Sequence, residues 1–143
     1  MTKSRTNWLR ITTIILLVLL VFQFEFGMAV NLSNLPTLNP YNFTLFNIFI
    51  ALQAAGTIAV IHASLGTFLT IFSILTLILS LLSRIRSIQI FGSLGFLSAA
   101  VAELNGVLFT LSGYQNNGYS HGMATNFILT FIFNFLVLYF LKS

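Results

Sequence analysis

The stretch from Tyr41 to Leu82, YNFTLFNIFIALQAAGTIAVIHASLGTFLTIFSILTLILSLL, decides the fold of this chain. It contains no Asp, Glu, Lys or Arg over 42 residues, and it ends directly before the basic segment Ser83-Arg84-Ile85-Arg86. An apolar run of this length is typical of a membrane-spanning segment. A single helix of that length would measure about 63 Å, roughly twice the hydrocarbon thickness of a bilayer. The run therefore contains either two short spans or one span with a segment that does not cross.

The composition of the whole chain excludes a water-soluble domain. The chain has 143 residues, of which 57% are hydrophobic and 6% charged, and its mean hydropathy is +0.99, whereas soluble domains carry about 25% charged residues. Cysteine is absent, which excludes dithiol chemistry, Cys-ligated zinc and iron–sulfur clusters. We expect a multi-pass protein of the cell membrane, with the lipid bilayer as a partner and no nucleic acid. All six basic residues lie at the ends of apolar runs, as membrane topology requires: Lys3, Arg5, Arg10, Arg84, Arg86 and Lys142.

The positions of these basic residues decide between the two topologies. With one span in the long run, every basic residue falls on the cytoplasmic side; with two spans, the last three would face outside. We therefore predict an all-α fold, an integral membrane four-helix up-down-up-down bundle in a single domain (1–143), with both termini cytoplasmic. Residues 41–54 would extend the second helix beyond the membrane or lie along its outer surface. The predicted spans are about 9–30, 55–83, 87–112 and 121–141, with an external loop at 31–54.

Besides the basic residues, the chain has two Glu and two His, and each predicted helix contains one of these four. They are Glu25, His62, Glu103 and His121. An ionisable residue inside a membrane costs several kcal/mol unless it is paired, so each is a functional candidate. At about 1.5 Å per residue, the two Glu lie about 24 Å and the two His about 30 Å from the inner face. In an up-down bundle helices 1 and 3 are diagonal, as are 2 and 4, so the two His are expected to face each other, and so are the two Glu.

Each of these residues also has a plain structural interpretation. His121, at the predicted membrane edge, fits a water-exposed loop histidine. His62 fits a cap on a buried carbonyl, and Glu25 fits a residue that reaches the external interface. Glu103 is the hardest of the four to explain as an exposed residue.

Small residues recur on one face of the third predicted span, at spacings of three and four. This spacing lets another helix, or a flat ligand, approach the backbone closely, and helix packing is the simpler explanation. The residues are Gly92, Gly95, Ala99, Ala102 and Gly106.

Both histidines have small neighbours, which leaves room for a bulky group between their helices. Ala59 and Ala63 flank His62, and Gly118 and Gly122 flank His121. Haem fits such a site, because its porphyrin is a large apolar plate and imidazole is a usual axial ligand of its iron. With four spans, and His on helices 2 and 4 near one face, the sequence resembles the small four-helix membrane cytochromes of b type. The resemblance is architectural and covers the whole chain loosely.

The resemblance implies a haem-binding membrane protein of cytochrome b type, an oxidoreductase or electron-transfer protein working near the outer membrane face. It implies haem b as cofactor, either one haem with His62 and His121 as axial ligands or two haems with one His each. Glu25 and Glu103 would accept protons or hold hydrogen bonds around the site. A quinone or an external redox molecule would be the partner. Tyr114 and Tyr119 fit an interfacial belt, and either is able to hydrogen-bond a propionate or a Glu.

Three alternatives remain open at the level of sequence. Two His and two Glu also suit a non-haem ion such as zinc, iron or manganese. Chains of Glu and His carry protons in transporters. The third alternative is a non-enzymatic structural subunit of a larger membrane complex. The sequence also leaves open whether the chain forms a homo-oligomer.

Overall fold

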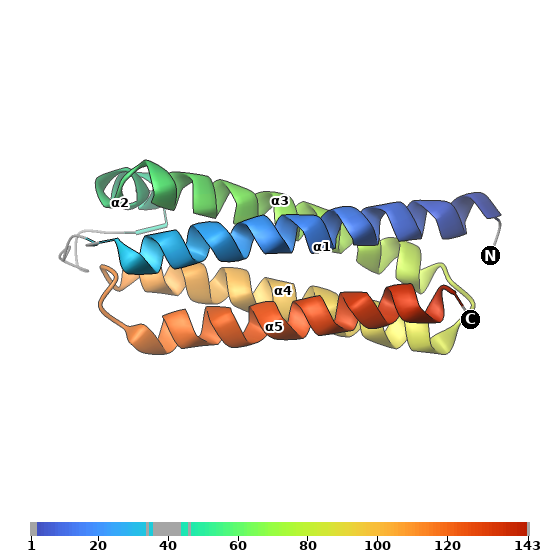
Figure 1. Ribbon diagram of the computed structural model, residues 1–143. Coiled ribbons are helices and arrows are strands. Elements are labelled where there is room, and N and C mark those ends of the chain that lie inside the picture. The colour runs from blue at the N-terminus through green and yellow to red at the C-terminus, as the bar shows by residue number, and fades with distance from the viewer. Residues whose placement is uncertain (1–2, 34, 36–43, 46, 143) are drawn as a thin grey trace.

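The computed structural model describes residues 3–33, 35, 44–45 and 47–142. Over these residues the chain is all-α, and four of its helices are long and apolar enough to cross a membrane, which confirms the predicted all-α class and the number of spanning helices. The helices, shown in Figure 1, are α1 Lys3–Leu32, α2 Ile48–Ala55, α3 Thr57–Leu81, α4 Arg86–Leu111 and α5 Asn117–Phe140.

The long apolar run contains one helix of spanning length, α3, and the short helix α2 before it. Gly56 separates the two with φ 101° and ψ 171°, a backbone conformation that is essentially restricted to glycine. The run therefore breaks at this glycine and does not continue as one helix. The external loop expected at 31–54 begins later than predicted, because α1 continues to Leu32, and its last part is the helix α2.

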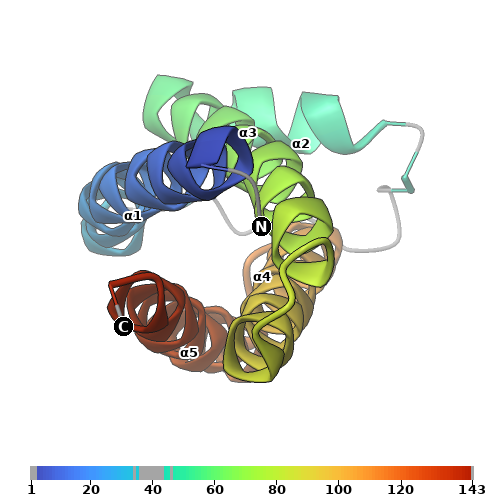
Figure 2. The ribbon, with the colours of Figure 1, turned by 90° about the vertical axis from the view of Figure 1, so that its right-hand side faces the viewer.

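The four long helices are arranged in an arc. In the end view of Figure 2 the order around the arc is α1, α3, α4 and α5, with an opening between α1 and α5. The packing agrees, because α4 contacts α5 most extensively and α1 contacts α5 least among these neighbours. Helix α2 packs against α3 and α4. Both termini lie at one end of the molecule, where α3 also connects to α4 (Figure 1).

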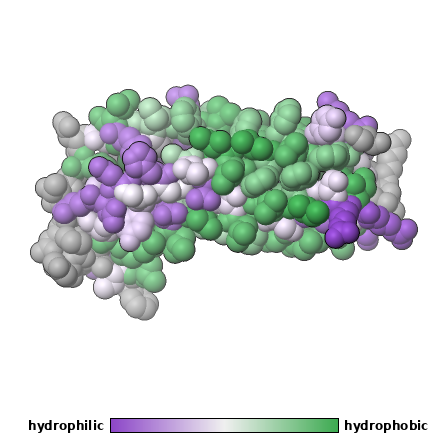
Figure 3. All heavy atoms as spheres, turned by 90° about the horizontal axis from the view of Figure 1, so that it is seen from below, coloured by the Kyte–Doolittle hydropathy of each residue, from purple (hydrophilic) through white to green (hydrophobic). Residues whose placement is uncertain are grey.

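Contacts between the helices in the half near the termini use small and polar residues. A Cβ added at Gly92 would overlap the side chain of Ser80, and one added at Gly95 would lie 2.8 Å from Asn134 Nδ2. Such close approach is typical of membrane proteins, where lipid contacts an apolar side chain as favourably as another helix does. On the face shown in Figure 3, a hydrophobic band lies between hydrophilic residues toward the two ends.

Candidate functional site inside the bundle

A cavity of about 400 Å³ lies between the four long helices, toward the end opposite the termini. Its walls are mostly apolar, with a few polar groups contributed by different helices, which is the composition typical of a small-molecule site. The polar residues of the lining are Gln23, Asn31, His62, Thr67, Glu103, Thr110, Tyr114, Ser120 and Thr130.

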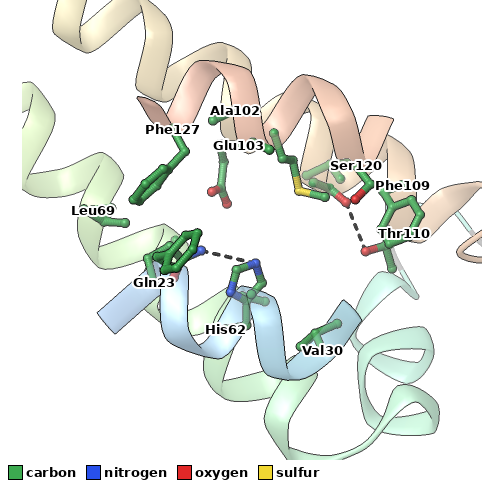
Figure 4. A pocket seen from close by; sticks show the side chains of 18 of the residues that line it. Gln23, Val30, His62, Leu69, Ala102, Glu103, Phe109, Thr110, Ser120 and Phe127 are labelled. Atoms are coloured by element: carbon green, nitrogen blue, oxygen red, sulfur yellow. Dashed lines mark hydrogen bonds between the residues drawn. The ribbon is translucent and has the colours of Figure 1, made fainter. Parts of the chain in front are cut away.

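His62 projects from the second turn of α3 and is half-buried. Its Nε2 lies 3.4 Å from Nε2 of Gln23 on α1, as the dashed line in Figure 4 marks. Its Nδ1 is buried and has no hydrogen-bond partner among the described residues. Gly27 makes room for the ring, because a Cβ at that position would lie 3.0 Å from His62 Cε1. Nδ1 of His62 is therefore a buried, unpartnered polar atom that lies against α1 at Gly27.

Glu103 extends from α4, on the opposite wall, toward Gln23 and His62 (Figure 4). Its carboxylate lies against the backbone of α3 at Gly66, one helical turn after His62. A Cβ at Gly66 would lie 2.7 Å from Glu103 Oε2 and 3.4 Å from Gln23 Nε2. Glycine at this position thus lets an imidazole, an amide and a carboxylate share one cavity.

The structure does not bring His121 into this cavity. His121 lies in the second turn of α5, is exposed, and is absent from the lining, whereas its neighbours Ser120 and Ala124 are part of it. At about 100° per residue, His121 lies about 20° around the helix from Ile128, at the edge of the lining face. The two histidines expected to face each other across the core are therefore at the same end of the bundle but on different surfaces.

Two other predicted site residues also lie outside the lining. Glu25 is exposed on α1, and Tyr119 is half-buried at the start of α5. The two Glu therefore do not meet across the core, because the helical phase of α1 directs residue 25 away from the cavity.

Gln23 is the site residue that the sequence analysis missed. It is uncharged, so it does not stand out among the ionisable residues of the apolar spans. A signal was nevertheless present, because Gln23 and Gly27 are four residues apart and lie on one helical face, and both contact His62. Glu25 is two residues after Gln23, which is about 200° around the helix, and it therefore faces away from His62.

A hydrogen bond from Tyr114 holds α2 beside the end of the cavity that is away from the termini. This residue follows α4, has φ 63°, and donates a hydrogen bond from its hydroxyl to the carbonyl oxygen of Ala51 at 3.0 Å. Ile48 and Leu52 of α2 line the cavity beside it. Burial raises the pKa of Tyr114, so the hydroxyl stays protonated and continues to donate at neutral pH.

The described part of the chain contains no group of three or more His, Asp or Glu side chains that could hold a metal ion. A comparison with protein-family models, with curated proteins and with solved structures found no match. The resemblance to cytochromes of b type therefore has no family match behind it, and the geometry of the cavity is the basis for any functional proposal.

Proposed function

We propose that this protein binds haem b in the cavity and transfers electrons near the outer membrane face, as membrane cytochromes of b type do. The observation that supports the proposal is the ring of His62, which lines a mostly apolar cavity and has one nitrogen beside Gln23 and the other, Nδ1, buried at Gly27 without a partner. The ring would have to turn to present a nitrogen to the iron. In the structure Gln23 Nε2 faces His62 Nε2 as a donor, which leaves the proton of a neutral ring on Nδ1. If the Gln23 amide turns by 180°, its unpartnered Oε1 would accept from Nε2–H and Nδ1 would keep its lone pair, the arrangement usual for histidines that bind a metal.

The walls of the cavity suit a large apolar plate. Alanines on two helices keep the walls low, and aromatic rings supply apolar contacts: Ala63, Ala99 and Ala102, with Phe24, Phe109 and Phe127. The space at Gly66 and Gly106 is taken by Glu103 and Met123. When bound, haem would supply one-electron chemistry at its iron. His62 is the first ligand in this proposal. His121 becomes the second only if its side chain turns from the exposed side of α5 into the cavity.

The basic residues suggest which end of the bundle faces outside. α1 begins at Lys3, Arg84 and Arg86 lie at the α3–α4 connection, and Lys142 follows α5, so all basic residues are at the end with the termini. By the positive-inside rule this end is cytoplasmic, which gives the up-down-up-down topology with both termini inside and the cavity in the outer half. A quinone or an external redox molecule would then exchange electrons with the site, and Glu103 would accept a proton.

The test is an absorption spectrum of the purified protein reconstituted with haem, oxidised and then reduced with dithionite. We expect a Soret band that His62→Ala abolishes. His121→Ala is the matched variant: loss of sharp α and β bands with haem retained would mean that His121 is the sixth ligand. Full haem content in His62→Ala would disprove the proposal. Unchanged sharp bands in His121→Ala would remove His121 from the site.

A non-haem metal ion is the second candidate, because His62 and Glu103 share the cavity. A colourless protein that carries stoichiometric zinc or manganese, lost in Glu103→Gln, would favour it. The third alternative, a structural subunit that docks through its small residues, has less support. Gly92, Gly95 and Gly106 face Ser80, Asn134 and Met123 inside this chain.

A further inference from the structure

The arc of long helices is least closed between α1 and α5. These two helices contact each other less than the other neighbours do, and Figure 2 shows the opening between them. Across this opening the rings of Phe24 and Phe127 stack, with centroids 5.7 Å apart and an interplanar angle of 30°. This aromatic pair is therefore a principal contact between α1 and α5 at the level of the cavity.

A separate apolar groove, with a volume of about 290 Å³, lies at the same opening and is lined by Val21, Phe24, Phe127, Ile128 and Phe131. None of these residues is polar. Phe24, Phe127 and Ile128 belong to the wall of the cavity as well. The groove and the cavity are thus adjacent, and the side chains of Phe24 and Phe127 lie where the two meet.

The other described boundaries of the cavity include polar contacts or a larger apolar cluster. At the end away from the termini, α2 lies beside the cavity and is held by the hydrogen bond from Tyr114 to Ala51. Toward the termini, Gly95 packs against Asn134, and Leu16 and Leu20 of α1 cluster with Leu69 of α3, against which Phe127 also packs. The wall between α1 and α5 is held by apolar contacts, and the side chains of Val21, Phe24 and Ile128 at this wall are exposed.

We propose that the ligand of the cavity enters from the hydrocarbon layer of the bilayer, between α1 and α5, and that Phe24 and Phe127 form the gate. The ligand class is an apolar molecule dissolved in the membrane that carries a polar group for Gln23, His62 and Glu103. This inference rests on the cavity of the proposed function being a ligand site, but it does not require haem to be that ligand.

The natural absence of cysteine allows a direct test. Ala102→Cys places a single thiol in the cavity wall, and its reaction with N-phenylmaleimide in liposomes is followed by mass spectrometry. Adding Phe127→Ala is expected to raise the labelling rate about two- to tenfold, the factor that corresponds to losing one aromatic pair. The matched control is Phe133→Ala, which removes a stacked pair with Phe91 between α4 and α5.

The outcomes separate the entry routes. A faster rate with Phe127→Ala and an unchanged rate with Phe133→Ala support entry between α1 and α5. Equal effects of the two variants mean general loosening and overturn the proposal. A rate raised by Tyr114→Phe and not by Phe127→Ala overturns it in favour of entry beneath α2, and so does the absence of any labelling. Because no haem is used, failure of haem binding and failure of this route are distinguishable.

Discussion

Gly56 is the residue whose backbone sets the position of α2. Its φ of 101° is strained for other residues, and nothing lies within 4 Å of an added Cβ, so a substitution acts through the backbone alone. We expect Gly56→Ala to destabilise the native state by about 1–3 kcal/mol and to loosen α2. Hydrogen exchange at residues 48–55 measures this effect, with Thr57→Ala as the neighbouring control. Exchange at the wild-type rate in Gly56→Ala would show that α2 is not held by this turn.

Tyr114 gives the same region a dependence on pH. Burial raises the pKa of its phenol above the ordinary value of about 10. The stabilising contribution is therefore complete below the unfolded-state pKa and is lost as pH rises through the folded-state pKa. We expect exchange protection of α2 to be constant from pH 7 to about 10 and to fall above that. Tyr114→Phe, which cannot donate to Ala51, should show weaker protection without this transition; an identical transition in that variant would assign it to another group.

The depth of a residue in the bundle could be predicted from the sequence, and its rotation about the helix could not. Counting residues from the basic ends put His62 and Glu103 at similar levels, and both line one cavity. The same count put Glu25 and His121 at these levels as well, yet both side chains are exposed. Rotation is hard to predict here because apolar residues cover all faces of a spanning helix, so no polar face marks the side in contact with lipid.

At the scale of helices, the packing of α4 against its neighbours depends on its glycines. A Cβ at Gly92 would overlap the short, rigid side chain of Ser80, whereas a Cβ at Gly106 would meet only the flexible end of Met123, at 3.3 Å from Sδ. We expect Gly92→Ala to force α3 and α4 apart at a cost of about 1–3 kcal/mol. Gly106→Ala should be nearly neutral. Thermal unfolding of the two variants in the same detergent tests this, and equal midpoints would contradict the proposed role of Gly92.

The number of long apolar helices could be predicted from apolar length and basic ends, but two features of the helix arrangement could not. The break between α2 and α3 depends on the backbone angles of one glycine, which were not predicted from a run that is apolar on both sides. The opening between α1 and α5 depends on which apolar faces meet, and the residues around it, such as Val21 and Phe131, are compatible with contact to lipid or to protein. For such residues the bilayer and a helix are equivalent surroundings.

At the scale of the whole molecule, the orientation in the membrane decides which compartment the cavity serves. The basic residues lie at the end with the termini, and the cavity lies toward the other end, so the orientation proposed from the positive-inside rule would put the cavity in the outer half. Two exposed positions mark the two ends: Leu82 after α3 and Asn117 at the start of α5. Each supports a single-cysteine variant in this cysteine-free chain.

We expect a membrane-impermeant thiol reagent to label Asn117→Cys in intact cells, and to label Leu82→Cys only after permeabilisation. Neither substitution removes a basic residue, so the charge that orients the protein is unchanged. The reversed pattern would put the cavity and Glu103 near the cytoplasm, and any electron partner would then have to be a cytoplasmic one. Labelling of both variants without permeabilisation would mean a mixed orientation, in which case the six basic residues alone do not fix the topology.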